Sequence, residues 1–173
     1  MTISMYEASI PVFVRALNNL IAILEKAQVH AEMKNIDPGV LLQYRLYPDM
    51  FPLVRQVQIV SDIAKAGGAR LAGQEPPRYE DDETTFAELV ARLQKTVAFL
   101  SDLTPELFEE AQARTITWPM RGTTMSLEGQ VYLLHYVLPN LFFHITTSYA
   151  ILRHCGVAVG KQDFLGKFQG ALL

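Results

Sequence analysis

The sequence predicts an all-α protein, an antiparallel four-helix bundle formed by one domain over residues 1–173. Apolar residues recur at steps of three and four along several long stretches, which is the spacing of one helix face. Half of the residues are hydrophobic and 19% are charged, so the chain can fill a single core. Connections of medium length separate the stretches, and neighbours joined in this way favour antiparallel packing.

The first long helix is expected over residues 4–30. Its apolar face comprises Tyr6, Ile10, Phe13, Leu17, Leu20, Ile21 and Leu24. Pro11 lies inside this pattern, and because proline has no backbone N–H it should bend the helix or mark its first turn. Asp37 is a favoured N-cap and Pro38 suits a first helical position, so a short helical turn through Leu42 should follow.

The second long helix is expected over residues 50–71, with Asp49 as its N-cap. Gly67 and Gly68 are small enough to let another helix approach closely. The charged residues of this stretch should form a solvated outer face: Arg55, Asp62, Lys65 and Arg70. Residues 74–84 contain two prolines and several acidic residues, so we expect a linker that does not pack.

The third long helix is expected up to Asp102, because Thr85 and Glu88 form a capping box at its start. A short extra helix should cover residues 105–110. Residues 115–125 are rich in β-favouring side chains and contain a glycine, so a small β-hairpin or an extended crossover should precede the last long helix.

The fourth long helix should occupy most of residues 126–156, with Ser126 as N-cap and Gly156 at its end. Pro139 should bend it. The residues expected to face the bundle are Leu134, Val137, Leu138, Leu141, Ile145, Ser148 and Leu152. The tail over residues 156–173 should lie along the bundle or across a partner subunit.

Composition excludes several classes of protein. The net charge is −3 and no basic stretch stands out, which argues against nucleic-acid binding. The single cysteine, Cys155, allows no intrachain disulfide. The start of the chain lacks the pattern of a signal peptide, and the longest apolar run, residues 131–143, is too short to span a membrane. We therefore expect a cytoplasmic protein that binds no membrane.

His144 is the leading candidate for chemistry. It lies on the inward face of the fourth helix, one turn after Asn140, and a neutral imidazole is a good ligand for zinc, nickel or iron. The alternative is a core histidine whose two nitrogens are satisfied by neighbouring polar groups. Gln56 is the polar residue closest to the inward face of the second helix. The other candidates are weaker: His30, His135, His154 and Cys155.

Three segments resemble a known family: SMYEASIPVF, DMFPLVRQVQIVSDIAKAGGARLAG and LPNLFFHITTSYAILRHCGVAVGKQDFLG. On these segments the chain is similar, over nearly its whole length, to an uncharacterised bacterial domain-of-unknown-function family. That family lies within the DinB-like (YfiT-like) superfamily of metalloenzymes. The resemblance implies a four-helix bundle, often a dimer, in which one histidine from the second helix and two from the fourth bind a divalent metal.

The resemblance also implies where those ligands would fall in this sequence. His144 matches the second histidine of the fourth helix, because Arg153 and Gly156 follow it at the expected offsets. The first histidine would fall at Asn140, and the histidine of the second helix at Gln56. Neutral carboxamides are poor ligands for borderline metals. The resemblance therefore implies a degenerate metal site.

Two functions follow from these expectations. The first is a non-catalytic or small-ligand-binding homodimer that needs no cofactor. The alternative is a divalent-metal-dependent hydrolase or thiol transferase that uses zinc or nickel at His144.

Overall fold

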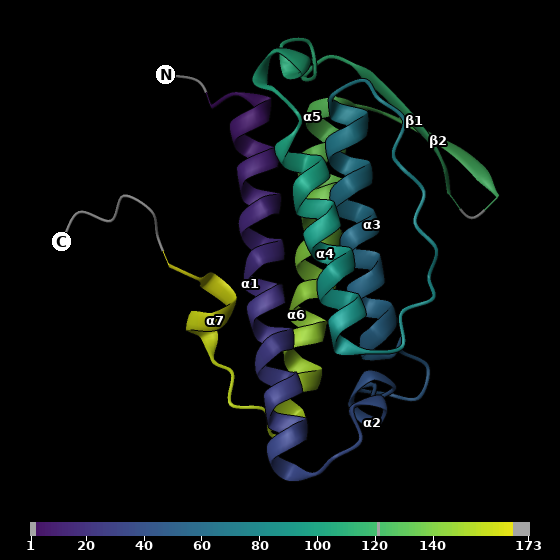
Figure 1. Cartoon of the computed structure of the whole chain (residues 1–173). Helices are drawn as coiled ribbons and strands as arrows, with labels where there is room; N and C mark the ends of the chain where they lie inside the picture. Colours follow the sequence, from purple (N-terminus) through teal and green to yellow (C-terminus); the bar gives the residue numbers. More distant parts are fainter. Residues whose placement is uncertain (1–2, 121, 168–173) are drawn as a thin grey trace.

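The computed structural model describes residues 3–120 and 122–167. Over these residues the chain is mostly helical and carries one small antiparallel sheet, as the sequence predicts. Four of the described helices have at least 16 residues and lie side by side (Figure 1). They are α1 (Met5–Lys34), α3 (Leu53–Leu71), α4 (Phe86–Ser101) and α6 (Leu138–His154).

Capping groups explain where two of these helices begin. Ser4 accepts a hydrogen bond from the backbone N–H of Glu7, and the Glu7 carboxylate bonds back to the Ser4 N–H. Thr85 and Glu88 form the same capping box at the start of α4, as predicted. Helix α1 continues through Pro11 without ending.

The start of α3 differs from the prediction. Asp37 caps α2 (Pro38–Leu42) as expected, but Asp49 does not cap α3. The helix begins at Leu53, after Pro52, and its N-cap makes no side-chain hydrogen bond. The first N–H of the helix instead donates to the carbonyl of Tyr44 at 2.9 Å, so the turn before the helix already satisfies it.

Helices α3 and α4 run in the same direction, while α1 and α6 run opposite to them (Figure 1). The expected antiparallel order therefore does not hold for the neighbours α3 and α4. A helix of 19 residues is about 28 Å long. The extended connection after α3 is long enough to return the chain to the end at which that helix began.

This connection, residues 74–84, is called the strap below. The prediction that it does not pack is wrong. Its residues Asp81 and Glu83 bind the side chain of Arg92, which is only 2% exposed, at 3.0 and 2.9 Å. Asp62 on α3 binds the same guanidinium at 2.9 Å. Asp81 also forms an ion pair with Arg55 on α3, so the acidic residues of the strap join it to both helices.

The prediction of a solvated outer face on α3 is also wrong. The side chain of Lys65 is 7% exposed; its Nζ lies 2.8 Å from Asp62 and 3.9 Å from the ring centroid of Tyr79. Arg55 is half-buried and forms an ion pair with Asp81. Helical spacing placed these residues outside the core, but the strap covers them with opposite charge and an aromatic ring.

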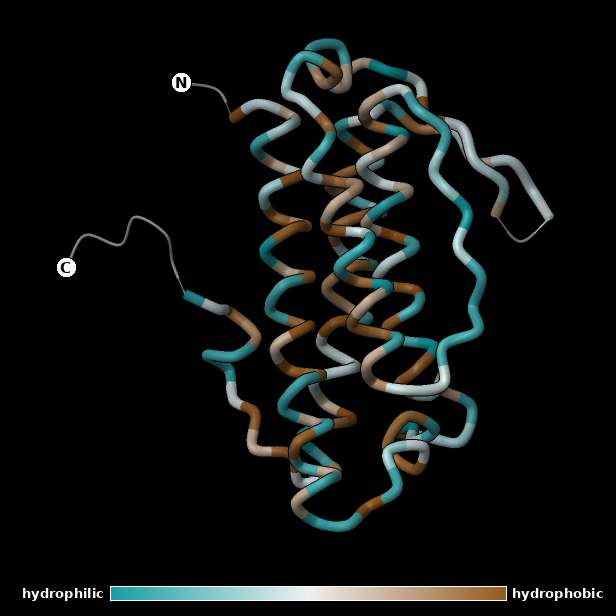
Figure 2. Tube along the Cα trace, viewed as in Figure 1, coloured by the Kyte–Doolittle hydropathy of each residue, from teal (hydrophilic) through white to brown (hydrophobic). Residues whose placement is uncertain are grey.

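The core lies between the four long helices and is formed by their buried apolar residues. Figure 2 shows these hydrophobic positions alternating with hydrophilic ones along each helix. Small residues set how closely the helices approach, as predicted. A Cβ at Gly67 would lie 2.7 Å from Val137, and one at Gly68 would lie 2.4 Å from Leu100. Helix α3 can therefore pack directly against its neighbours only because these two positions have no side chain.

The predicted hairpin is confirmed: β1 (Thr115–Met120) pairs antiparallel with β2 (Thr123–Glu128). A short 3-10 helix, η1 (Pro105–Phe108), comes before it in the chain. Ser126 lies inside β2 and is paired with Thr117, so its prediction as the N-cap of the last helix is wrong. Glu128 occupies that place instead.

The last helical stretch consists of α5 (Gly129–Val131), the π-helix η2 (Tyr132–Val137) and α6. The wider turns of a π-helix change which side chains face inward. Tyr132 and Leu133 are buried in consequence, whereas Leu134, predicted to face the bundle, is 45% exposed. Beyond Val137 the helix is regular and most of the predicted inward residues are buried.

The described part of the tail packs on α1. Helix α7 (Lys161–Leu165) is held there by Asp163, whose carboxylate lies 2.6 Å from Nζ of Lys26. Asn19 donates to the carbonyl of Phe164 at 3.0 Å. Residues 168–173 lie outside the described residues.

Helix α1 is long and apolar enough to cross a membrane by composition alone. Half of its most apolar window is buried inside the protein, as in the core helix of a soluble protein. The helix therefore does not point to a membrane protein.

Candidate functional site at the Gln56–His144 pair

Helices α3 and α6 bring Gln56 and His144 together. Oε1 of Gln56 lies 2.6 Å from Nδ1 of His144. Gln56 is 2% exposed, and His144 is half-buried. Two of the three predicted site residues, 88 positions apart in the chain, therefore meet directly between the helices.

The hydrogen bonds of this pair define its protonation. Nε2 of Gln56 donates to the carbonyl oxygen of Phe51 at 3.1 Å. Because a carbonyl only accepts, the NH₂ end of the amide must face Phe51, and its oxygen must face His144. Nδ1 of His144 therefore carries the proton and donates, and Nε2 carries the lone pair.

The second nitrogen of His144 differs from the first in its surroundings. Nε2 has no hydrogen-bond partner among the described residues, and it is not one of their buried unpartnered atoms. It is therefore not fully buried. Burial lowers the pKa of His144, and the nearby positive charge of Arg55 lowers it further. The imidazole is accordingly neutral at pH 7 and presents a hydrogen-bond acceptor.

Asn140 uses its amide nitrogen elsewhere. Nδ2 donates to the carbonyl oxygen of Tyr136 at 2.6 Å, one turn earlier in the helix. No hydrogen bond joins Asn140 to Gln56 or His144 in the described chain. Pro139 and the π-helix before it disturb the regular backbone ladder here, and the Asn140 side chain provides a donor to it.

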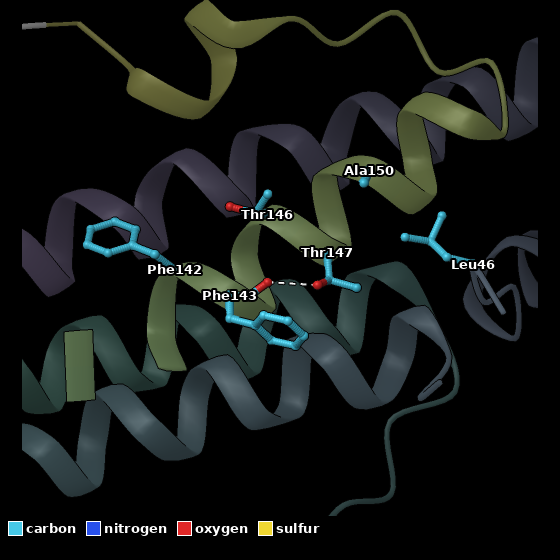
Figure 3. A pocket seen from close by; sticks show the side chains of 6 residues that line it. All are labelled: Leu46, Phe142, Phe143, Thr146, Thr147 and Ala150. Carbon is cyan, nitrogen blue, oxygen red and sulfur yellow. Dashed lines mark hydrogen bonds between the residues drawn. The ribbon is translucent and has the colours of Figure 1, made fainter. Parts of the chain in front are cut away.

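A surface groove of about 440 Å³ lies over α6. Its lining residues are Leu46, Phe142, Phe143, Thr146, Thr147 and Ala150. Phe142 and Phe143 point to different sides of α6, and Thr146, Thr147 and Ala150 follow them along the same helix (Figure 3). The ring of Phe143 meets that of His144 edge to face, with centroids 5.1 Å apart. His144 does not itself line the groove, but its ring contacts that of Phe143, which does.

Sequence reasoning did not find this groove, nor the effect of Arg55 on His144. The doublet Phe142–Phe143 was the available signal. Consecutive helix positions point about 100° apart, so two adjacent aromatic residues cannot both enter a core on one side. Their exposed fractions are 37% and 58%.

The other predicted candidates lie away from the pair. His135 is exposed in the π-helix. His154 is exposed at the end of α6, where its Nε2 lies 3.0 Å from the hydroxyl of Tyr44. His30, predicted to be solvated, is half-buried. Burial raises the pKa of the Cys155 thiol, so the group stays protonated at neutral pH.

A family model described as a domain of unknown function (DUF1993) matches residues 5–165. The chain belongs to this family. The crystal structure of a DinB family member from Shewanella denitrificans, at 1.83 Å resolution, is similar to this DUF1993 chain, with 43% sequence identity and a TM-score of 0.91. The match covers 98% of this chain and 96% of that one. The comparison with curated proteins found no match. The resemblance to an uncharacterised DinB-like family is thus confirmed.

The side chains of this DUF1993 member do not fit the three-ligand metal centre that the resemblance implies. Gln56 faces Nδ1 of His144, and so cannot share a metal bound at Nε2. Asn140 is bonded to its own helix. Among the described residues, no three His, Cys, Asp or Glu side chains gather closely enough to hold a metal ion. One imidazole and two neutral amides are also a weak donor set for zinc or nickel.

Proposed function

We propose that this protein is a non-catalytic helical bundle that binds a small molecule and has a degenerate metal site, in which amides stand at two of the three ligand positions. The observation that carries the proposal is the hydrogen bond between Gln56 and His144. This hydrogen bond orients the imidazole through an amide alone. A metal site would also orient its histidine, but it would place further ligands around the same metal ion. The pair is suited to hold a ligand by hydrogen bonding.

The groove on α6 supports binding of a small molecule. Its volume of about 440 Å³ falls in the range of small-ligand sites. Its walls are the side chains of Leu46, Phe142 and Phe143, which are exposed aliphatic and aromatic groups. A ligand that covered them would remove apolar surface from water, which is the main source of binding energy in such sites.

The alternative function is a divalent-metal-dependent hydrolase or thiol transferase. The open lone pair on Nε2 of His144 favours it, because a neutral imidazole nitrogen can ligate zinc or nickel. Metal analysis separates the two functions. The protein should be purified without a histidine tag, incubated with excess zinc or nickel, dialysed, and analysed for metal per chain.

We expect substoichiometric metal in the native protein and no change in His144→Ala. A stoichiometric metal that is lost on His144→Ala would overturn the first function and establish the second. His154→Ala is the matched control, because His154 is an exposed histidine on the same helix and should leave metal content unchanged in either case.

We further propose that the protein acts as a homodimer in the cytoplasm and binds no nucleic acid. Several large apolar side chains are exposed in the described chain and would be covered by a second copy: Val29, Met33, Tyr47 and Phe51. Light scattering coupled to gel filtration should give twice the chain mass of 19.4 kDa. A single-chain mass at all concentrations tested would contradict the dimer and leave the ligand site untouched.

A further inference from the structure

We propose that α7 (Lys161–Leu165) is a releasable cover for the apolar surface beside the groove on α6. When α7 is attached, its residue Phe164 covers part of Phe142, which lines the groove. When α7 is released, the groove extends past Phe142 toward α1. The inference rests on the proposed ligand-binding function, because it assigns a regulation to the same groove.

The aromatic ring of Phe164 joins α7 to the groove. Its centroid lies 6.5 Å from that of Phe142 and 6.3 Å from that of Tyr149. Residues 142 and 149 are about two turns apart and therefore lie on one face of α6. Because α7 packs on α1 (Figure 1), the surface that Phe164 covers lies between the groove and α1. The apolar surface of the groove therefore continues beneath α7.

The C-terminal end of α7 is held by side chains of α1. Nδ2 of Asn19 donates to the carbonyl oxygen of Phe164 at 3.0 Å. A guanidinium nitrogen of Arg15 donates to the carbonyl oxygen of Leu165 at 2.8 Å. The carbonyls of a last helical turn have no partner inside their own helix, so these two bonds satisfy groups that α7 cannot satisfy itself.

The attachments of α7 are weak enough to be broken. None of its residues is buried. The side chains of Lys26 and Asp163, which form an ion pair at 2.6 Å, are 49% and 25% exposed. Exposed ion pairs contribute little stability, and ordering the segment costs conformational entropy. A helix of five residues is also not stable on its own. The attached and released states are therefore close in free energy.

The chain before α7 provides a hinge. Val157 and Val159 are 1% and 2% exposed, so they fix the chain to the core. Gly160 follows them, and nothing lies within 4 Å of the position that its Cβ would occupy. A glycine in open space can change its backbone angles without a clash. Helix α7 can therefore leave α1 while the core stays packed.

Hydrogen exchange of the full chain, followed by mass spectrometry, measures the release of α7. Phe164→Ala removes the aromatic contact and should speed exchange over residues 161–166 by about tenfold, without changing exchange in α3. Lys26→Gln removes the exposed ion pair and should speed it by about threefold. Lys161→Gln is the matched control, because Lys161 is an exposed lysine of α7 that forms no ion pair with the described residues. Its exchange should equal that of the native chain.

Titration with Nile red, an uncharged apolar dye, measures the effect of release on the groove. The dye should bind the released state more tightly, because more apolar surface is exposed. Its apparent affinity and the exchange rate both rise with the population of the released state. The affinity should therefore increase from the native chain to Lys26→Gln and again to Phe164→Ala, in the same order as exchange. Lys161→Gln should bind the dye like the native chain.

The outcomes separate the inference from the function on which it rests. Faster exchange in Phe164→Ala with unchanged dye affinity would refute the cover while leaving a ligand-binding groove. Unchanged exchange in both variants would show that α7 is not releasable and would refute the inference as well. No binding of the dye by any of these proteins would overturn both proposals. If Phe164→Ala fails to fold, Lys26→Gln with Lys161→Gln as control makes the same comparison.

Discussion

Replacing Arg92 by methionine tests the strongest electrostatic feature of the fold. The Arg92 side chain is 2% exposed and forms ion pairs with Asp62, Asp81 and Glu83. It also donates to the carbonyl of Glu80 at 2.7 Å. Methionine keeps much of the length and apolar volume of the side chain but removes every one of these contacts. The strap would then lose its main attachment to α4.

The expected cost follows from the burial of the partners. Removing one member of a buried ion pair costs about 3–5 kcal/mol, because the partner is left uncompensated. Glu83 has a side chain 10% exposed and should contribute most of this cost, whereas Asp62 and Asp81 are 38% and 39% exposed and regain water. We therefore expect a loss near the lower end, about 3 kcal/mol.

Urea denaturation followed by far-UV circular dichroism measures this loss. With a slope of roughly 2 kcal/mol per molar urea, the midpoint should fall by about 1.5 M. Lys95→Met is the matched control, because Lys95 is exposed on the same helix and lies 4.1 Å from the ring centroid of Tyr79, over which Arg92 also lies at 5.6 Å. Its cost should stay within about 0.5 kcal/mol. A loss below about 1 kcal/mol in Arg92→Met would refute the inference that Arg92 holds the strap against the helices and stabilises the fold.

Three further predictions concern other parts of the chain. Gly129→Ala should lower the thermal midpoint strongly or prevent folding, because its Cβ would lie 1.9 Å from the backbone oxygen of Ala111; Gly160→Ala has nothing within 4 Å and should leave the midpoint nearly unchanged. The pKa of His144 is lowered in the folded state, because the fold stabilises the neutral imidazole over the charged one. The contribution of His144 to the free energy of unfolding is therefore complete above pH 6.5 and declines as the pH falls below that value. Urea titrations at pH 7.5, 6.5 and 5.5 should show this decline in the native chain and a smaller one in His144→Gln. If the free energy of unfolding fell equally with pH in both proteins, His144 would not be the group responsible. Pro139→Ala should keep the fold but shift the side chain of His144 in a crystal structure, since a new backbone donor enters the disturbed ladder, and an unchanged position would count against this.

The sequence predicted which two side chains meet but not how they meet. Helical periodicity placed His144 on an inward face and Gln56 close to one, and the structure joins them by a hydrogen bond of 2.6 Å. Periodicity could not show that Gln56 binds Nδ1, because that depends on the distance and rotation of two helices. Nor could it show that Asn140 turns to its own backbone, because the π-helix before it is not encoded by a pattern of apolar residues.

The sequence was least informative about the strap. Proline and acidic residues over residues 74–84 are typical of a solvated connection, and their local pattern gives no other indication. Their partners, Arg92 on α4 and Arg55 on α3, lie on two different helices that meet only in the folded chain. A buried charge is stable only where its opposite charge is already in place, and that pairing is a property of tertiary structure.

The sequence by itself determined which segments form helices, because caps, helical periodicity and β-favouring residues act over a few neighbouring positions. It also determined the resemblance to the DinB-like family. Only the tertiary structure decided that α3 and α4 run in the same direction, and that His144 meets an amide. These features depend on groups far apart in the chain whose separation is set by packing. The local pattern of residues gives no information about the distance between such groups in the folded chain.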